Sequence, residues 1–242
     1  GSRIPVLVPG SGRAEAFLWT ADAGLLGIGD LPGGVVGSTA SGVSADGSTV
    51  VGDGFNGVNH EAFRWTSGGG MVGLGDLTGG FSHSFAEDVS DDGSTVVGWT
   101  GSFAGTQAFR WTPSDGMVGL GDLPGGHTLS QGFAVSGDGS TIVGSGSSAS
   151  GTEAFRWTAG DGMVGLGDLP GGAVHSRAPG LSSDGSPIVG SSRSASGIEA
   201  FKWTADGGMV GLGDLPGGGF DSFATTASAD GSVIVGTGRR SF

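Results

Sequence analysis

Short apolar runs alternate with glycine-rich turns along the whole chain, and the pattern returns every 46 residues. In one copy, four candidate strands follow one another at residues 84–90, 94–98, 107–112 and 117–123. The Asp-Gly pair between the first two is a strong hairpin signal, and Pro-Ser-Asp-Gly between the last two is a turn sequence. No segment shows a helical period long enough to compete. The pattern therefore predicts repeats of four short β-strands.

The period holds without a slip over five copies. The motif E-A-F-R-W-T and its variants begin at residues 15, 61, 107, 153 and 199. The elements G-[LI]-G-D-L and S-x-D-G-S keep the same spacing. Four strands in a repeat of about 40–45 residues are typical of a β-propeller blade. A solenoid is the alternative, but it needs atypical capping repeats, whereas the end units here look ordinary.

The places where the repeats start and stop indicate how a ring would close. The first unit starts at its third strand, with Glu15, and the last stops after its second strand, near Gly236. The two terminal halves can therefore complete one blade. We expect an all-β fold: a five-bladed β-propeller of 46-residue, four-stranded repeats, with the ring closed by interlocking N- and C-terminal strands.

The domain organisation follows from the same register. Residues 15–237 are expected to form a single propeller domain, and residues 238–242 a C-terminal tail. Residues 1–14 are expected to form an N-terminal extension, whose opening Gly-Ser resembles a cloning scar. Residues 3–8 share the register of the last strand of the final unit but do not match the repeat. We expect them outside the regular blade.

Three repeated elements carry a resemblance to a known family: E-A-F-R-W-T, G-M-V-G-L-G-D-L-P-G-G and V-S-x-D-G-S-T-V-V-G. They resemble the bacterial HAF-type extracellular repeat family over nearly the whole chain. The resemblance implies a secreted or cell-surface location, and it supplies no catalytic motif. In architecture alone, a five-bladed ring is also similar to tachylectin-type lectins and to five-bladed glycosidases, a similarity that carries little functional weight.

Composition narrows the expected partners. The chain has 10 basic and 23 acidic residues, for a net charge of −13, and its glycine count is high, at 56. Such a charge argues against nucleic acid, whose phosphates attract clustered Lys and Arg. No apolar run approaches about 18 residues, so we expect no membrane span. Cysteine is absent, so no disulfide can be argued. We expect a monomer without a cofactor.

The repeated residues are expected to form the frame. Trp65 and its equivalents should pack between blades, and Asp76 and its equivalents should bind backbone donors. The Asp of S-x-D-G-S forms a turn, and one carboxylate per turn is too few for calcium, which takes six to eight oxygen ligands. Arg64 and its equivalents are expected to form salt bridges with the Glu of the same motif or with a neighbouring blade. No metal site is expected.

The differences between copies concentrate in two loops per unit, which lie on the same face because alternate loops of an up-and-down sheet share a side. Binding residues are often found on loops held by a rigid scaffold. Exposed aromatic and polar side chains there suit carbohydrate or protein ligands. The alternative is drift in unconstrained loops. The candidate ligand-binding residues are Phe55, Asn59, His60, Phe81, His83, Trp99, Phe103, His127, His175, Arg177, Arg193 and Phe220.

An enzyme is the third class to consider. A glycoside hydrolase needs two carboxylates facing each other across a pocket. The non-repeating acids nearest the variable face are Asp53, Glu87, Asp88 and Asp221, and nothing in the sequence groups them into an acid and a nucleophile. We therefore expect no enzyme and assign no catalytic residue. The favoured function is a secreted or surface binding or adhesion module with carbohydrate or a cell-surface protein as candidate ligand. The alternatives are a ligand-free structural scaffold and a glycoside hydrolase.

Overall fold

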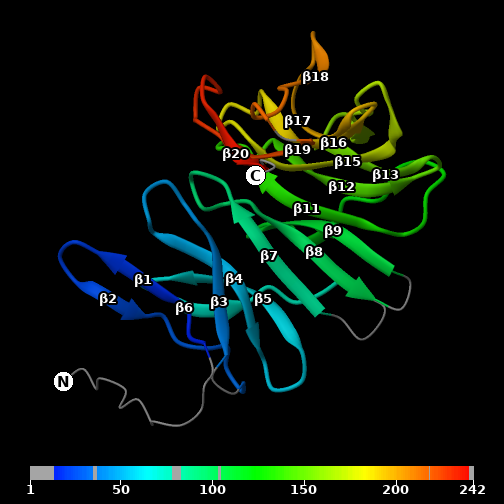
Figure 1. Cartoon of the computed structure of the whole chain (residues 1–242). Helices are drawn as coiled ribbons and strands as arrows, with labels where there is room; N and C mark the ends of the chain where they lie inside the picture. Colours follow the sequence, from blue (N-terminus) through cyan, green and yellow to red (C-terminus); the bar gives the residue numbers. More distant parts are fainter. Residues whose placement is uncertain (1–13, 35–36, 78–82, 103–104, 218, 240–242) are drawn as a thin grey trace, which may run out of the picture.

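The computed structural model describes residues 14–34, 37–77, 83–102, 105–217 and 219–239 (Figure 1). These residues form strands and turns and contain no helix, which confirms the all-β prediction. No helix among them is long and apolar enough to cross a membrane. The expectations for residues 3–8, and for Phe81 and Phe103, concern positions outside the described residues.

Four complete repeat units each contain four antiparallel strands, which neighbour one another in sequence order. Unit I contains β3 (Ser38–Val43), β4 (Thr49–Phe55), β5 (His60–Thr66) and β6 (Gly70–Gly73). Unit II contains β7 (His83–Val89), β8 (Val96–Ser102), β9 (Gly105–Thr112) and β10 (Gly116–Gly119). Unit III contains β11 (Ser130–Val135), β12 (Thr141–Ser148), β13 (Gly151–Thr158) and β14 (Gly162–Gly165). Unit IV contains β15 (Gly171–Leu181), β16 (Ile188–Ser194), β17 (Gly197–Thr204) and β18 (Gly208–Gly211).

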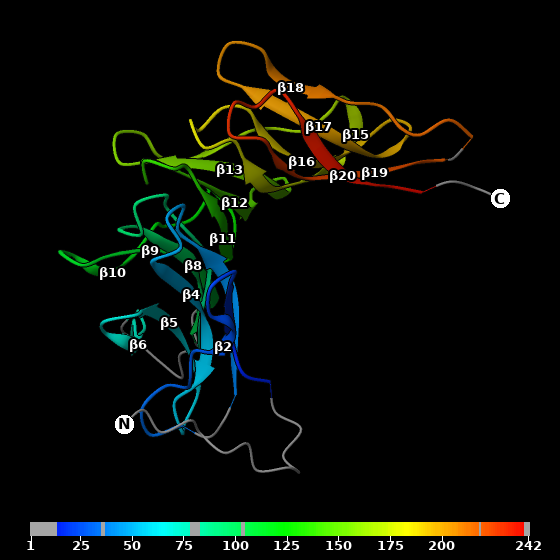
Figure 2. The ribbon, with the colours of Figure 1, turned by 90° about the vertical axis from the view of Figure 1, so that its left-hand side faces the viewer.

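Two half-units complete the described chain. At one end, β1 (Phe17–Thr20) and β2 (Gly24–Gly27) pair with each other as a separate two-stranded sheet. At the other end, β19 (Phe220–Ala227) pairs with β20 (Ile234–Gly238) and forms half-unit V. Figures 1 and 2 show the units arranged along a curved arc with these half-units at its two ends. No pairing between β20 and β1 occurs among the described residues, so closure of the ring stays a prediction.

The first strand of each unit lies on the inner side of the arc. The successive first strands β3, β7, β11, β15 and β19 contact one another. The fourth strands β6, β10 and β18 lie on the outer side (Figure 2). Short parallel bridges also join neighbouring units, as between Thr152 and His175 or between Ile198 and Asp221. The inner strands are therefore the place where residues of different units meet.

Hydrophobic packing between units uses the repeated aromatic motif. The four phenylalanines of the complete units, Phe63, Phe109, Phe155 and Phe201, are all fully buried. Phe109 packs with Ala86 and Val96 of its own unit and with residues of unit I, and Trp111 and Met117 pack against the same cluster. The motif E-A-F-R-W-T thus supplies the core between units, as the sequence predicts.

A buried serine links each unit to the next. In the junction between units II and III, the Ser130 hydroxyl accepts the Ala108 N–H at 3.1 Å and donates to the Gly121 carbonyl at 2.8 Å. The same pair of bonds recurs at the four other junctions, through Ser38, Ser84, Ser176 and Ser222. Because buried backbone groups need partners, this serine satisfies one donor and one acceptor of the preceding unit.

The S-x-D-G-S element forms a turn closed by its own aspartate. The Asp46 carboxylate accepts bonds from the Ser48 backbone N–H at 2.9 Å and from the Ser44 hydroxyl at 2.7 Å. These bonds lower the pKa of Asp46 to about 2, and the same bonds lower the pKa of the equivalent aspartates. Gly47 follows with φ of 72°, a conformation that favours glycine. The predicted turn role is therefore seen directly in the hydrogen bonds.

The arginines at the fourth position of the E-A-F-R-W-T motif do not form the expected pairs. Arg110 and Arg156 form salt bridges with Asp115 and Asp161, at 2.8 and 2.6 Å, in the turn that follows their own strand. Arg64 instead donates to the Gly93 carbonyl of the next unit and to the Thr49 hydroxyl. The expected partner, the motif glutamate, is used elsewhere: Glu61 accepts the Gly75 N–H at 3.0 Å. The described salt bridges of these arginines therefore use neither expected partner, the motif glutamate or a neighbouring unit. The glutamate is not available because it already binds the backbone just after the fourth strand.

We expect Ser130→Ala to lower the free energy of unfolding by about 1–3 kcal/mol, because it leaves the buried Ala108 N–H and the partly buried Gly121 carbonyl without this partner. Chemical denaturation measures the change. The matched control is Ser150→Ala, at an exposed serine in the next loop, which should change stability by less than about 0.5 kcal/mol. Equal effects of the two substitutions would contradict the linking role of Ser130.

We expect the serine-capped turns to weaken in acid. The pKa of Asp46 is lowered from 3.8 to about 2 in the folded chain, so its stabilising contribution is complete above the unfolded pKa and is lost as pH falls through the folded pKa. The stability difference between the wild type and Asp46→Asn should therefore shrink from pH 4 to about pH 2. Denaturation at several pH values tests this, with Asp206→Asn as the control; a difference that stays constant with pH would argue against the mechanism.

Candidate functional site

The inner strands present one row of side chains to the units' interior and another to the inner surface. In β7, Ser84 and Ala86 are buried, whereas His83, Phe85 and Glu87 alternate with them and are exposed or half-buried. This period of two is what a strand imposes on its side chains. The buried row repeats in the other units, and the row on the inner surface does not. The non-repeating chemistry therefore gathers on this surface.

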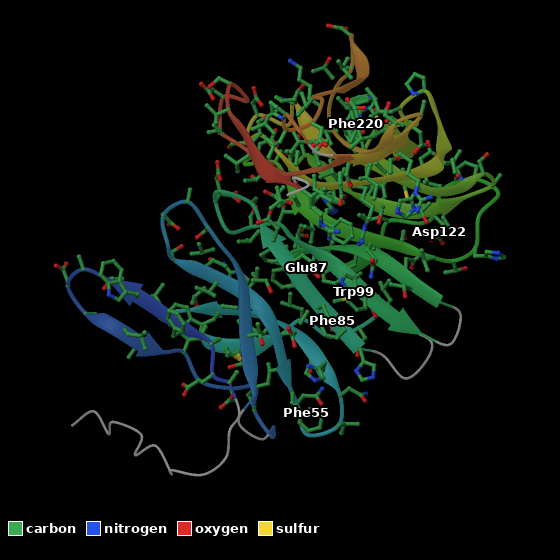
Figure 3. All side chains as sticks on the ribbon, viewed as in Figure 1. Phe55, Phe85, Glu87, Trp99, Asp122 and Phe220 are labelled. Atoms are coloured by element: carbon green, nitrogen blue, oxygen red, sulfur yellow. The ribbon has the colours of Figure 1, made fainter. Side chains whose placement is uncertain are left out.

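Five aromatic rings from units I and II form a connected group, which we call the aromatic cluster: Phe55, His60, His83, Phe85 and Trp99. The Phe85 and Trp99 rings stack with their centroids 4.3 Å apart, and His60 stacks on Phe85 at 5.8 Å. Phe55 meets His60 edge-on at 6.0 Å, and His83 lies 6.3 Å from His60. Figure 3 shows Phe85 and Trp99 side by side on β7 and β8, with Phe55 near the end of β4.

Strand register explains how this cluster arises. Phe85 and Trp99 are directly paired residues of neighbouring antiparallel strands, a position in which aromatic side chains interact closely. Between them the backbone is tight: a side chain at Gly98 would collide with the carbonyl of Phe85. Only glycine fits there, so the strands approach and bring the two large rings together.

Two carboxylates hold the cluster at its ends. The Trp99 indole N–H donates to Glu87 at 2.8 Å, and His60 Nδ1 lies 2.9 Å from Asp53 Oδ2. The Asp53 side chain is 17% exposed and the His60 side chain 50% exposed. The cluster thus combines apolar ring surface, hydrogen-bond acceptors and an imidazole within reach of solvent.

A separate pocket of about 430 Å³ lies on the inner surface of units III to V, and we call it the III–V pocket. Phe133, Pro179, Ile198 and Phe223 supply most of its apolar wall. Arg177 lies over the Phe133 ring, with its guanidinium carbon 5.1 Å from the ring centroid. His175, Ser191 and Thr225 add polar groups. Its chemistry therefore differs from that of the aromatic cluster, which has carboxylates instead of a guanidinium.

The predicted binding residues divide among several places. Phe55, His60, His83 and Trp99 meet in the aromatic cluster, while His175 and Arg177 line the III–V pocket. The remaining described candidates lie elsewhere: Asn59 closes the β4–β5 loop by hydrogen bonds with Asn56, His127 and Arg193 are exposed, and Phe220 lines a shallower hollow with Arg239. A single site built from the whole set does not form, because the loops belong to units spread along the arc (Figure 3).

The four acids considered for hydrolysis each have another partner. Asp88 was expected near the variable face, but its carboxylate lies between units and accepts the backbone N–H groups of Val89 at 2.8 Å and Val135 at 3.0 Å. Burial raises its pKa. Asp221 pairs with Arg239 at 3.2 Å, and Asp53 and Glu87 bind His60 and Trp99. Asp88 therefore links units II and III and does not face a ligand.

Aspartates of the G-[LI]-G-D-L element act as backbone acceptors where their bonds are described. Asp30 accepts the Gly37 N–H at 2.8 Å and Asp168 the His175 N–H at 2.9 Å. Burial raises the pKa of Asp76 and of Asp168. Within the part of the chain that the structure describes, no three His, Asp or Glu side chains are grouped to hold a metal ion.

Sequence reasoning missed several inner-surface residues. Phe85, Phe133, Pro179 and Phe223 were not selected, and Glu87 was considered only as a hydrolase acid. All lie within strands, whereas the search for differences between copies was confined to loops. A signal was present: positions 39, 85, 131, 177 and 223 are equivalent, yet hold Thr, Phe, Gln, Arg and Phe. A strand position that holds four different residue types in five copies indicates a surface facing something other than the neighbouring unit.

Comparison with known proteins supports the fold and nothing narrower. No family model and no curated protein matches the sequence. Among solved structures, TolB from Acinetobacter baumannii is similar, with a TM-score of 0.54 and 15% identity over 82% of this chain and 48% of TolB. A protein assigned as TolB from Agrobacterium tumefaciens has a TM-score of 0.50 and 17% identity over 82% of this chain and 79% of its own. This chain thus spans about half the length of the Acinetobacter protein. At these identities the similarity establishes a β-propeller type of fold, built here from four-stranded repeat units.

Proposed function

We propose that this chain is a binding module that takes a carbohydrate on the aromatic cluster. The observation that carries the proposal is the stacked pair of Phe85 and Trp99 on the inner surface, held by the Glu87 carboxylate. The rings, the Asp53–His60 pair and Glu87 come from four strands of two units. A rigid scaffold thus presents them together.

The chemistry of the cluster suits a sugar. Sugar rings have apolar C–H faces that pack on aromatic rings and hydroxyls that need hydrogen-bond partners, and ligand sites typically combine apolar walls with a few polar groups. Carboxylates make strong, charge-assisted bonds to hydroxyl donors. Phe85 and Trp99 are half-buried, so part of their surface is available to a ligand.

Location is part of the proposal. The repeated motifs resemble those of the HAF-type extracellular repeat family, and we propose a secreted or cell-surface protein on that basis. A net charge of −13 is compatible with such a protein. The proposal assigns the chain no catalytic role, and a scaffold without a ligand is the alternative that the binding experiment tests.

A glycan array followed by titration calorimetry tests carbohydrate binding. We expect Trp99→Ala to weaken the binding of any sugar identified by about tenfold or more, since an aromatic contact contributes about 0.5–1.5 kcal/mol beyond its buried area. Glu87→Gln, which removes the charge but keeps an acceptor, should weaken it less.

The control is His127→Ala, at an exposed, non-repeating histidine outside the cluster, which should leave the affinity unchanged. Absence of binding at millimolar sugar, with thermal stability intact, would favour the ligand-free scaffold. Binding that survives Trp99→Ala would place the sugar elsewhere.

We also propose that the module is a five-bladed ring closed by pairing β20 with β1. Exposed apolar side chains at the two ends support this. Phe17, Trp19 and Leu25 are 55, 63 and 67% exposed, whereas the equivalent Phe63, Trp65 and Met71 of unit I are nearly buried. Half-unit V carries a hollow of about 280 Å³, lined by Leu212, Ala224 and Ile234 among others. In a complete unit, the Phe, Trp and Met of the third and fourth strands occupy the equivalent place.

An engineered disulfide tests the ring, because the chain has no cysteine of its own. Leu18 and Val235 are equivalent to Arg64 and Val51, which are directly paired in unit I. Paired strand residues have the Cα separation that a disulfide needs. We expect Leu18→Cys with Val235→Cys to give an intramolecular crosslink on non-reducing gels. Leu18→Cys with Val210→Cys, on the outer strand β18, is the control that should not crosslink. A crosslinked dimer would show that the ends pair between two chains instead.

A further inference from the structure

The III–V pocket is a second cavity with a chemistry of its own. Its volume of about 430 Å³ falls within the range of about 300–1,000 Å³ that is usual for small-molecule sites. Its residues come from β11, β15, β16, β17 and β19, so three units contribute to it. It shares no residue with the aromatic cluster. Whatever it binds is therefore recognised independently of the proposed sugar.

The pocket contains a basic side chain in an otherwise acidic chain. Arg177 lines it, and His175, two residues earlier on the same strand, lines it as well. None of the described residues that line it is acidic. The ion pairs found in the described part of the chain involve His60, Arg110, Arg156 and Arg239, not Arg177. Given a net charge of −13, a basic side chain without a carboxylate beside it indicates a place for an external anion.

The position of the guanidinium is defined by its contact with an aromatic ring. Arg177 lies over Phe133 at 5.1 Å, an arrangement in which the ring face attracts the cation and limits its motion. The equivalent positions in the other units, Thr39, Phe85, Gln131 and Phe223, are uncharged. Arg177 is thus specific to one unit and is not part of the repeated frame. A planar guanidinium presents paired donors that match the two oxygens of a carboxylate.

The other residues that line the pocket indicate the chemistry of the rest of the ligand. Pro179, Ile198 and Phe223 are apolar, while Ser191 and Thr225 offer hydroxyls. A simple inorganic anion would gain nothing from the apolar wall, whereas an apolar body would be stabilised by leaving water there. We propose that the III–V pocket binds a small organic carboxylate, with its carboxylate on Arg177 and its apolar body against Phe223 and Ile198.

Titration calorimetry or ligand-detected NMR at low salt tests this with phenylacetate as the probe. Phenylacetamide has the same shape without the charge, and acetate has the charge without the apolar body. We expect phenylacetate to bind with a dissociation constant of about a millimolar and both analogues to bind about tenfold more weakly or less, since each lacks one half of the recognised chemistry. Equal binding of phenylacetamide would overturn the role of the cation, and no binding of phenylacetate up to about 20 mM would overturn the proposal.

Matched charge variants localise the site. Arg177→Gln should weaken phenylacetate binding by about tenfold, because it removes the guanidinium. Arg193→Gln removes the same charge from an exposed position on the neighbouring strand β16 and should leave binding within about twofold. Both substitutions are at exposed residues, and unchanged thermal unfolding checks that both variants fold.

A similar loss in both variants would mean a general charge effect and would contradict the assignment. Because Arg177 lies outside the aromatic cluster, sugar binding should be the same in Arg177→Gln and the wild type. The two proposals can therefore fail separately.

Discussion

Each junction between repeat units depends on one buried serine hydroxyl. It accepts a backbone N–H from the third strand of the preceding unit and donates to a backbone carbonyl just after that unit's fourth strand. The bond lengths hardly change across five junctions, with the donated bond at 2.8 Å in every case. A buried hydrogen-bond pair of this kind costs little when complete and much when one partner is removed. The serine therefore fixes the spacing of the units, and the phenylalanine core packs around that spacing.

Within a single inner strand, the residues that form the junction alternate with residues that vary between units. In β7, Ser84 and Ala86 belong to the junction, and Phe85 between them does not. The same alternation leaves Arg177 free to differ from its equivalents Gln131 and Phe223. Because the period is two, neighbouring residues can serve different purposes without disturbing each other. The inner surface then carries two unlike regions: aromatic and acidic in units I and II, apolar and basic in units III to V.

The motif phenylalanines are fully buried within the four full units, whereas Phe17 at the N-terminal end is largely exposed. Trp19 in β1 is largely exposed, whereas its equivalent Trp65 is nearly buried, although the local sequences are almost the same. Trp65 clusters with Val50 of its own second strand and with Ala16, Ile28 and Leu31 of the preceding half-unit. In the described part of the chain, Trp19 has neither a second strand of its own unit nor a preceding unit beside it. A repeat unit buries its motif only when its own second strand and the preceding unit are in place, and dependence on a neighbouring unit is a general property of stacked repeats.

The sequence by itself determined the strands, the turns and the repeat. The Asp-Gly pairs mark tight turns because Gly47 and its equivalents adopt a positive φ that other residues disfavour. The fixed spacing of Phe63, Phe109, Phe155 and Phe201 marks them as frame residues, and all four are buried. Phe55, His60, His83 and Trp99 could be selected as candidates because they interrupt a repeated background.

The tertiary structure decided which of them meet. Phe85 and Trp99 lie opposite each other in neighbouring strands, and His60 of another unit stacks on Phe85. Asp88 faces the next unit because a register shift beside Ala86 redirects its side chain. Which side chains lie next to each other depends on strand pairing and on the packing of units, and the repeated sequence does not specify these.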